Sequence, residues 1–276
     1  MVSSEQRRKQ LAREKYLRQQ QRRAEARRKA RIRNAAVAVG LVLVLAAGGA
    51  YAASGGLGGG SEDGKDGKDA KDTAADAQPT PSKAPDPCEK PAKGKASTQQ
   101  WKEEPKVTID ESATYTMTLE TTCGEIGIEM DAAKAPHTVN SFHFLAGKGF
   151  FDHSPCHRLT TTGIHVLQCG DPTGQGNGGP GYTIPDENLK DPRVKDGTYP
   201  RGTVAMANTG QKDSGGSQFF LVYKDSKLPN SYTPFGTVSE AGMKVLDKIA
   251  EAGAGGPRGQ TPNATVVIDK ATVTAS

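Results

Sequence analysis

The stretch from Cys156 to Phe220 decides both the fold and the chemistry that this sequence predicts. It contains four short motifs, which are Cys156-His157-Arg158-Leu159, Gln168-Cys169-Gly170-Asp171, Met206-Ala207-Asn208 and Gly216-Ser217-Gln218-Phe219-Phe220. Strand-like segments at 156–160, 165–169, 203–208 and 218–223 would gather one cation, two amides and several apolar side chains in a shallow pocket. Without a carboxylate pair or a set of metal ligands, such a site suits a neutral, partly apolar substrate and a reaction that needs no strong base.

These motifs, in this order, resemble those of the cyclophilin family of peptidyl-prolyl cis-trans isomerases. The resemblance rests on the His-Arg pair, the Gln-x-Gly-Asp segment, Met-Ala-Asn and Gly-Ser-Gln-Phe-Phe, and it runs from about Thr114 to the C-terminus. It implies a mainly β fold, a closed eight-stranded antiparallel barrel capped by two α-helices. It also implies that proline-containing polypeptides are the substrates and that no cofactor and no metal are needed.

The hydrophobic pattern outside the motifs predicts a compatible set of elements. Apolar residues alternate on both sides of a turn at 123–124, which predicts a hairpin over 115–130 with one buried face. Pro136 starts a helix that ends near 147–149, and a second helix starts after Ser239 and stops at Gly253. Residues 266–273 form a last strand that is free to pair with the first.

The chemistry of prolyl isomerisation explains why an arginine would be the central residue. Rotation about an Xaa-Pro bond breaks amide resonance and faces a barrier of about 18–20 kcal/mol, whereas the two isomers differ by only about 0.5–1 kcal/mol. In the twisted state the imide nitrogen becomes basic, so a guanidinium aimed at it stabilises that state without proton transfer. Arg158 fits this role, and the resemblance assigns it there.

The same residue-by-residue match implies roles for the other motif residues. The proline ring would be held by Phe220, Met206 and Leu228, and the pocket would be completed by His165, Val166 and Tyr232. Gln168 and Gln218 would orient Arg158 and the peptide carbonyl, and His157 would support its strand. The backbone of Asn208, beside Ala207, would bind the substrate main chain. Lys227 replaces the tryptophan that many members use to bind cyclosporin, and His165 and Val166 alter the pocket floor. Cyclosporin binding is therefore expected to be weak.

Four cysteines in a domain predicted to be exported indicate two disulfides, for which three connectivities exist. Cys156 and Cys169 lie almost symmetrically about a turn at 162–163, so one connectivity is a cross-strand bridge between them, with Cys88 paired to Cys123. The family register, with Gln168 opposite Arg158, instead shifts Cys169 by one residue from Cys156. The connectivity stays open at this point.

Three other patterns point to alternative chemistry, and each departs from its template. The G-x-G-x-x-G pattern at 174–179 is followed at once by Pro180 and by no helical period, so it predicts a tight surface loop and no dinucleotide site. The segment around Ser214 resembles the nucleophile segment of trypsin-like serine proteases, but it lacks their flanking residues and their alanine-rich histidine segment. The five histidines fall within 137–165 without paired ligand spacing, so no metal site is predicted.

The N-terminal third of the chain differs sharply from the rest. Residues 1–33 hold 13 Lys and Arg against 3 Glu, which leaves 23 basic and 28 acidic residues in the remainder and makes nucleic acid an unexpected partner. Residues 34–53 are uncharged and almost wholly Ala, Val, Leu and Gly, long enough for the roughly 20 residues that span a bilayer. Residues 54–105, rich in Gly, Ser, Lys, Asp and Pro, predict a disordered linker, and 106–276 form the isomerase domain.

These features together predict a peptidyl-prolyl isomerase that assists the folding of exported proteins. The basic tail at 1–33 places the N-terminus in the cytoplasm, and residues 34–53 would act as a single-pass signal-anchor that holds the catalytic domain outside the cell membrane. The alternative is secretion after signal cleavage, because Ala50-Tyr51-Ala52 offers small residues of the cleavage type. The alternative function is a non-catalytic cyclophilin-like module that binds proline-containing segments.

Overall fold

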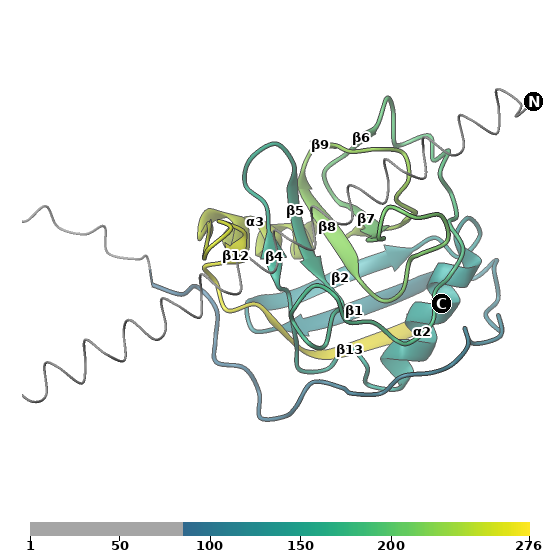
Figure 1. Ribbon diagram of the computed structural model, residues 1–276, viewed down its shortest axis with the longest axis horizontal. Coiled ribbons are helices and arrows are strands. Elements are labelled where there is room, and N and C mark those ends of the chain that lie inside the picture. The colour runs from purple at the N-terminus through teal and green to yellow at the C-terminus, as the bar shows by residue number, and fades with distance from the viewer. Residues whose placement is uncertain (1–84) are drawn as a thin grey trace, which may run out of the picture. The chain divides into compact units, whose positions relative to one another are not determined.

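Residues 85–276 are the part of the chain that the computed structural model describes, and within them a nine-stranded antiparallel sheet carries two helices (Figure 1). The sheet has the order β3 (Ser154–Pro155), β13 (Val267–Ala275), β1 (Tyr115–Thr121), β2 (Gly124–Met130), β10 (Pro234–Val238), β7 (Thr203–Met206), β8 (Phe219–Lys224), β5 (His165–Cys169) and β4 (Arg158–Leu159). Two small sheets pair β6 (Thr198–Tyr199) with β9 (Ser226–Lys227) and β11 (Ala254–Gly255) with β12 (Thr261–Pro262). The mainly β prediction with two helices is confirmed.

The sheet is curled, and its two ends are not joined by a strand ladder. β3 and β4 stand at opposite ends of the strand order and are linked in the chain by Cys156 and His157. Cys156 N donates to Val266 O at 2.9 Å and Leu159 N donates to Gln260 O at 2.7 Å, so both end strands attach to the segment that precedes β13. The predicted eight-stranded barrel closed by pairing is therefore corrected to a nine-stranded curled sheet, because the short end strands bond to this segment and not to each other.

The first hairpin and the last strand form as the periodicity predicts. Tyr115, Met117 and Leu119 on β1 are buried in alternation with more exposed neighbours, and β2 repeats the pattern from Ile126. Gly124 supplies the turn with φ of 128°, a conformation that only glycine adopts without strain. β13 pairs with β1 from Ala275 opposite Tyr115, so the terminal strands of the domain lie side by side.

Two helices cover this sheet, and both begin where the sequence predicts. α2 (Pro136–Gly147) has proline in its first turn and buries Phe142, whose ring centroid lies 4.7 Å from that of Phe235. α3 (Glu240–Glu251) is capped by Ser239, whose Oγ accepts from Gly242 N at 3.1 Å. The buried faces of the helices hold them against the sheet that carries the site.

Residues 85–105, called here the N-terminal arm, are packed on the domain, and the disordered linker predicted for this stretch is wrong there. Cys88 forms a disulfide with Cys123, and Trp101 lies 5.1 Å from Phe144 and 5.9 Å from Phe150 between ring centroids. The polar composition alone cannot offset the conformational entropy that is lost when this segment becomes ordered. The disulfide and the packing of the Trp101 ring offset it. The domain therefore starts upstream of residue 106.

The predicted N-terminal segments lie beyond this part of the chain. Between residues 85 and 276 no helix is long and apolar enough to cross a bilayer. The basic tail at 1–33, the anchor at 34–53 and the first part of the linker, 54–84, lie outside the described residues. Those predictions remain predictions.

Candidate active site

Arg158 stands on the end strand β4, directly opposite Gln168 on β5. Its guanidinium donates twice to neutral amide oxygens, from Nε to Gln260 Oε1 at 2.9 Å and from NH1 to Gln168 Oε1 at 3.2 Å. No carboxylate within residues 85–276 forms an ion pair with it. The side chain is thus held in place while its positive charge remains uncompensated, as electrostatic stabilisation of a developing lone pair requires.

The two glutamines predicted to orient Arg158 form a continuous chain of hydrogen bonds. Gln168 Nε2 donates to Gln218 Oε1 at 2.9 Å, and Gln218 Nε2 donates to the carbonyl of Gly178 at 2.9 Å. Each amide therefore has its oxygen directed toward the arginine side and its nitrogen directed away. The chain fixes the position of Arg158 relative to the loop that contains Gly178.

That loop, residues 173–179, contains the G-x-G-x-x-G pattern of 174–179, and it is built around a buried carboxylate. Asp171 Oδ2 accepts from the backbone nitrogens of Gly176, Asn177 and Gly178 at 2.7–3.1 Å, and Oδ1 accepts from N and Oγ1 of Thr173, both at 2.8 Å. Burial raises the pKa of Asp171, but these hydrogen bonds, led by those from Gly178 and Thr173, outweigh it and hold the pKa below its ordinary value. The donors point inward, so the loop offers no phosphate cradle.

His157 packs beneath the same loop. A Cβ on Gly176 would lie 3.4 Å from His157 Nε2, an ordinary van der Waals contact, and it is the φ of 78° at this position that favours glycine. Burial lowers the pKa of His157, Asp171 partly opposes this change and Arg158 adds to it. A neutral imidazole next to Arg158 leaves the guanidinium as the cation of the site, in agreement with a supporting role for His157.

An apolar cluster adjoins these polar groups and contains most of the residues predicted to hold the proline ring. Its buried members are Val166, Tyr199, Ala205, Phe220 and Val222, and Ile164, Val194, Ala207, Leu228 and Tyr232 pack against it partly exposed. The ring of Phe220 lies 5.4 Å from that of Tyr232. The half-exposed rim over a buried aromatic floor can accept a small apolar ring.

Two predicted pocket residues, Met206 and His165, are placed differently, whereas Asn208 keeps its backbone available. Met206 is 3% exposed and belongs to the main core cluster, so it supports the floor more than it lines it. His165 sits at a register shift in β5, and its ring lies 5.7 Å from that of Tyr223. Asn208 uses its side chain to bond Ser231 O at 2.6 Å and Gly210 N at 3.0 Å, and its backbone N–H and C=O have no partner among the described residues. That backbone is available to a substrate main chain.

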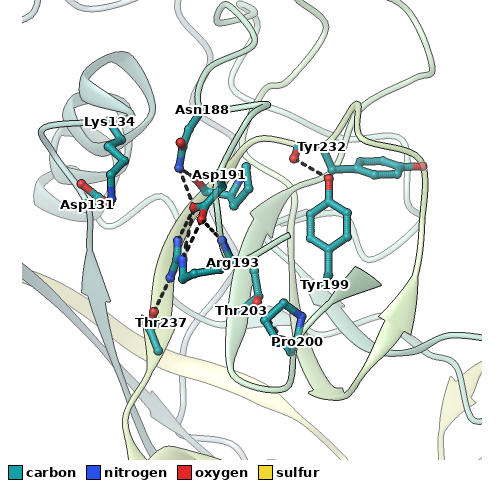
Figure 2. A network of polar contacts seen from close by, with 11 residues as sticks. Asp131, Lys134, Asn188, Asp191, Arg193, Tyr199, Pro200, Thr203, Tyr232 and Thr237 are labelled. Atoms are coloured by element: carbon teal, nitrogen blue, oxygen red, sulfur yellow. Dashed lines mark hydrogen bonds and ion pairs between the residues drawn. The ribbon is translucent and has the colours of Figure 1, made fainter. Parts of the chain in front are cut away.

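Tyr199 supports the apolar cluster from below, and no motif pointed to it. Its hydroxyl donates to Tyr232 O at 2.8 Å, as Figure 2 shows, and its ring lies 6.3 Å from Phe220. Burial raises the pKa of Tyr199 to about 12, so the hydroxyl remains a donor.

A second network holds the loop that leads into β6. The guanidinium of Arg193 contacts Thr237 and the buried Asp191, each at 2.7 Å, and Figure 2 shows both contacts.

The structure has the disulfides Cys156–Cys169 and Cys88–Cys123, one of the connectivities that the sequence left open. The register also places Arg158 opposite Gln168, so the two sequence arguments that conflicted are both correct. They coexist because β4 is only two residues long, and Cys156 has left the ladder to bond Val266. The Cys156–Cys169 bond thus links the ends of the two strands that carry Arg158 and Gln168.

Removing the disulfide beside the site is expected to destabilise the protein. The double substitution Cys156→Ser with Cys169→Ser should lower the free energy of unfolding by about 3 kcal/mol, because a crosslink closing a short loop restricts the unfolded chain by that order. Urea unfolding of the full chain measures it. The matched control, Cys88→Ser with Cys123→Ser, should lower stability without changing the kinetics at the site, whereas equal unfolding midpoints for wild type and the first variant would contradict the prediction.

The rival chemistries find no support in the geometry. Ser214 Oγ donates to Gln211 O at 2.7 Å and accepts from Thr209 N at 3.2 Å, and no histidine is its partner. Among residues 85–276 no group of three or more His, Cys, Asp or Glu is arranged to hold a metal ion.

Gln260 is the second residue that the motifs missed, and it should be a positioning residue for Arg158. Replacing Gln260 by alanine removes the acceptor of the Nε bond, so kcat should fall by about fivefold to tenfold, the equivalent of one hydrogen bond to a charged group, with KM little changed. Gln260→Glu serves as the control, since it keeps an acceptor but adds a negative charge that reduces the field of Arg158, and kcat should fall further. A glutamate variant as active as wild type would contradict this role.

Comparison with known proteins agrees with this geometry. Residues 116–273 match the model of the family described as cyclophilin type peptidyl-prolyl cis-trans isomerase/CLD. The chain is 44% identical over 197 residues to a probable peptidyl-prolyl cis-trans isomerase B of Mycobacterium leprae, covering 68% of this chain and 62% of the relative. It is 44% identical over 199 residues to the corresponding protein of Mycobacterium tuberculosis, covering 69% and 60%.

In each case the match spans less than two thirds of the relative's length. A crystal structure of a cyclophilin-type isomerase from Cryptosporidium parvum aligns with a TM-score of 0.49 at 24% identity, covering 59% of this chain and 99% of that one. The family model covers more than half of the chain, including every residue named above for the Arg158 site. The chain therefore belongs to the cyclophilin-type peptidyl-prolyl cis-trans isomerase family.

Proposed function

We propose that this protein accelerates rotation about Xaa-Pro bonds in polypeptides, with Arg158 as the catalytic residue. The observation that supports this most strongly is the pairing of an uncompensated, doubly anchored guanidinium with an apolar cluster rimmed by Leu228 and Tyr232. The cluster would bind the proline ring, and Arg158 would face the imide nitrogen as it becomes pyramidal. The preformed arrangement stabilises charge that is present only in the twisted state, which lowers the barrier.

The substrate main chain would be held next to this ring by the backbone of Asn208. Its unpartnered N–H and C=O can pair with an extended peptide as a neighbouring strand would. Ala207, whose own N–H is bonded to Gln218 O at 2.9 Å, fixes the path of that backbone. The apolar cluster would hold the proline ring and Asn208 would hold the main chain beside it. One side of the Xaa-Pro bond can then rotate while the other side stays bound.

We further propose that the domain works outside the cytoplasm on exported proteins, attached through residues 34–53. Two disulfides among the described residues support an oxidising compartment, where such bonds persist. The excess of Lys and Arg before residue 34 supports an orientation with that end inside. Weak cyclosporin binding remains an expectation, since Lys227 is exposed on β9 beside the pocket residue Leu228.

Two experiments test these proposals separately. The full chain should accelerate the slow, proline-limited refolding phase of an exported protein, while the final folded yield remains the same. Membrane fractionation of the cells that express it, followed by protease treatment of intact cells, should recover the chain in the membrane fraction and degrade residues 85–276 from outside. Recovery of an intact chain in the soluble cytoplasmic fraction would contradict the location, and an unchanged refolding phase would contradict the activity.

A further inference from the structure

Arg158 also lines a second hollow, a cavity of about 510 Å³ on the side of the β11–β12 hairpin. Its walls come from β4 and β5, from the loop at 174–176 and from the tip of the hairpin, with side chains of His157, Arg158, Gln168, Gln175, Arg258 and Gln260. Figure 1 shows β12 beside β4, so the hairpin forms a wall of the active site although it is distant in sequence. The prolyl-isomerisation mechanism gives no role to Gln175 and Arg258 of this set.

The hairpin tip presents Arg258 to the cavity. Gly259 N donates to Gly256 O at 3.0 Å, which closes a turn with Pro257 and Arg258 at its centre. The hairpin is fixed to β4 twice, by the bond from Leu159 N to Gln260 O and by the bond from Arg158 Nε to the Gln260 side chain. Arg258 is exposed and forms no ion pair within residues 85–276.

The charges around this cavity have one sign. Two arginines line it, and no aspartate or glutamate does. The nearby carboxylate of Asp171 lies fully buried under the glycine-rich loop, where its oxygens accept from Thr173, Gly176, Asn177 and Gly178. A cavity with an exposed arginine at its mouth that has no ion pair within residues 85–276 attracts anions and rejects cations.

We propose that this cavity is a subsite for an acidic side chain of the substrate, an Asp or Glu within about three residues of the isomerised proline. Each residue of an extended peptide spans at most about 3.3–3.6 Å, so a neighbouring side chain can reach the hairpin while the proline occupies the apolar cluster. Arg258 pairs with the acidic side chain of the substrate, and the guanidinium of Arg158 remains directed at the imide nitrogen. This inference rests on the proposed isomerase function and adds a sequence preference to it.

The test compares C-terminally amidated peptides that differ only in Glu, Gln or Lys, placed either one residue after the proline or two before it. Exchange NMR on the full chain measures the isomerisation directly and avoids the sequence preference of a coupled protease. At one of the two positions the Glu peptide should have a kcat/KM about threefold above that of the Gln peptide, the size expected of a solvent-exposed ion pair. The difference should lie in KM, because Arg258 binds ground and transition states alike.

Charge substitutions connect the preference to Arg258. Arg258→Gln should bring the Glu-to-Gln ratio to about 1, and Arg258→Glu should reverse it in favour of Lys, by the same ion-pair argument. Lys106→Gln is the matched control, since it removes the same charge from an exposed position in a different cavity, between α2 and β13, and should leave the ratio unchanged. In about 1 M salt, where the screening length is about 3 Å, the preference should disappear in wild type.

A ratio of 1 at both positions in wild type, or an unchanged ratio in Arg258→Gln, would overturn the subsite. Equal acceleration of all peptides would refute this inference and leave the isomerase function intact. No acceleration of any peptide would instead refute the isomerase function itself.

Discussion

Replacing Arg158 by alanine is expected to lower kcat/KM for Xaa-Pro isomerisation by about 10²- to 10³-fold, the usual effect of removing one preorganised electrostatic donor. The loss should appear mainly in kcat, because the guanidinium interacts with the imide nitrogen only when that nitrogen becomes basic in the twisted state. The proline ring still has Phe220 and its neighbours to bind. Exchange NMR on a short Xaa-Pro peptide measures both constants.

Arg158→Lys is the matched control for charge. A lysine keeps the positive charge but lacks the planar fork that donates to Gln260 and Gln168 together, so it should recover only part of the lost activity. Both variants should unfold at the wild-type temperature, since Arg158 is half-buried at the end of a two-residue strand. An alanine variant with activity within about twofold of wild type would remove Arg158 from the mechanism, because its electrostatic donation is worth far more.

Replacing Asp171 by alanine is expected to have the largest effect on stability. The substitution removes the buried carboxylate and leaves three partly buried backbone N–H groups of the glycine-rich loop without their acceptor. Breaking such a buried charged contact should lower the free energy of unfolding by about 3–5 kcal/mol. Activity should fall too, because the loop carries the Gly178 carbonyl that holds Gln218. Urea unfolding and peptide exchange on the same samples measure both losses.

The pH dependence separates the charge of Asp171 from its shape. The pKa of Asp171 is lowered from 3.8 in the folded protein, so its stabilisation is present above that value and is lost as the pH falls through the lower folded pKa. Asp171→Asn should be less stable at neutral pH, because one amide oxygen replaces two charged acceptors, and should lack this acid-dependent loss. Identical unfolding curves for Asp171→Asn and wild type at pH 7 and pH 3 would contradict the assigned role.

Local patterns predicted the parts of the fold that local physics controls. Alternation identified the β1–β2 hairpin, and Pro136 and Ser239 marked the starts of the helices, because caps and hydrophobic periodicity act within a few residues. The motif match brought Arg158 opposite Gln168, as observed. The near-symmetric spacing of Cys156 and Cys169 suggested their disulfide without deciding it, because the length of β4 that allows the bond could not be predicted from the sequence.

Contacts between distant segments were beyond local patterns. The composition of the N-terminal arm is polar enough to predict disorder, but its disulfide to Cys123, the packing of Trp101 on α2 and hydrogen bonds to distant segments hold it on the domain. Gln260 reaches Arg158 across 102 residues of sequence, and Tyr199 supports Tyr232 across 33. No propensity or spacing rule signals such pairs, because they are decided by how the sheet curls.

The most direct test of the central claim is exchange NMR on a short Xaa-Pro peptide with and without a catalytic amount of the full wild-type chain. If the protein is a catalyst, the cis-trans exchange rate rises in proportion to its concentration while the cis-to-trans ratio of the free peptide stays the same, since a catalyst lowers the barrier from both sides. Peptide signals that shift on binding while the exchange rate remains at its uncatalysed value would contradict it. That result would mean that the protein is a module that binds proline-containing segments without accelerating rotation about the Xaa-Pro bond.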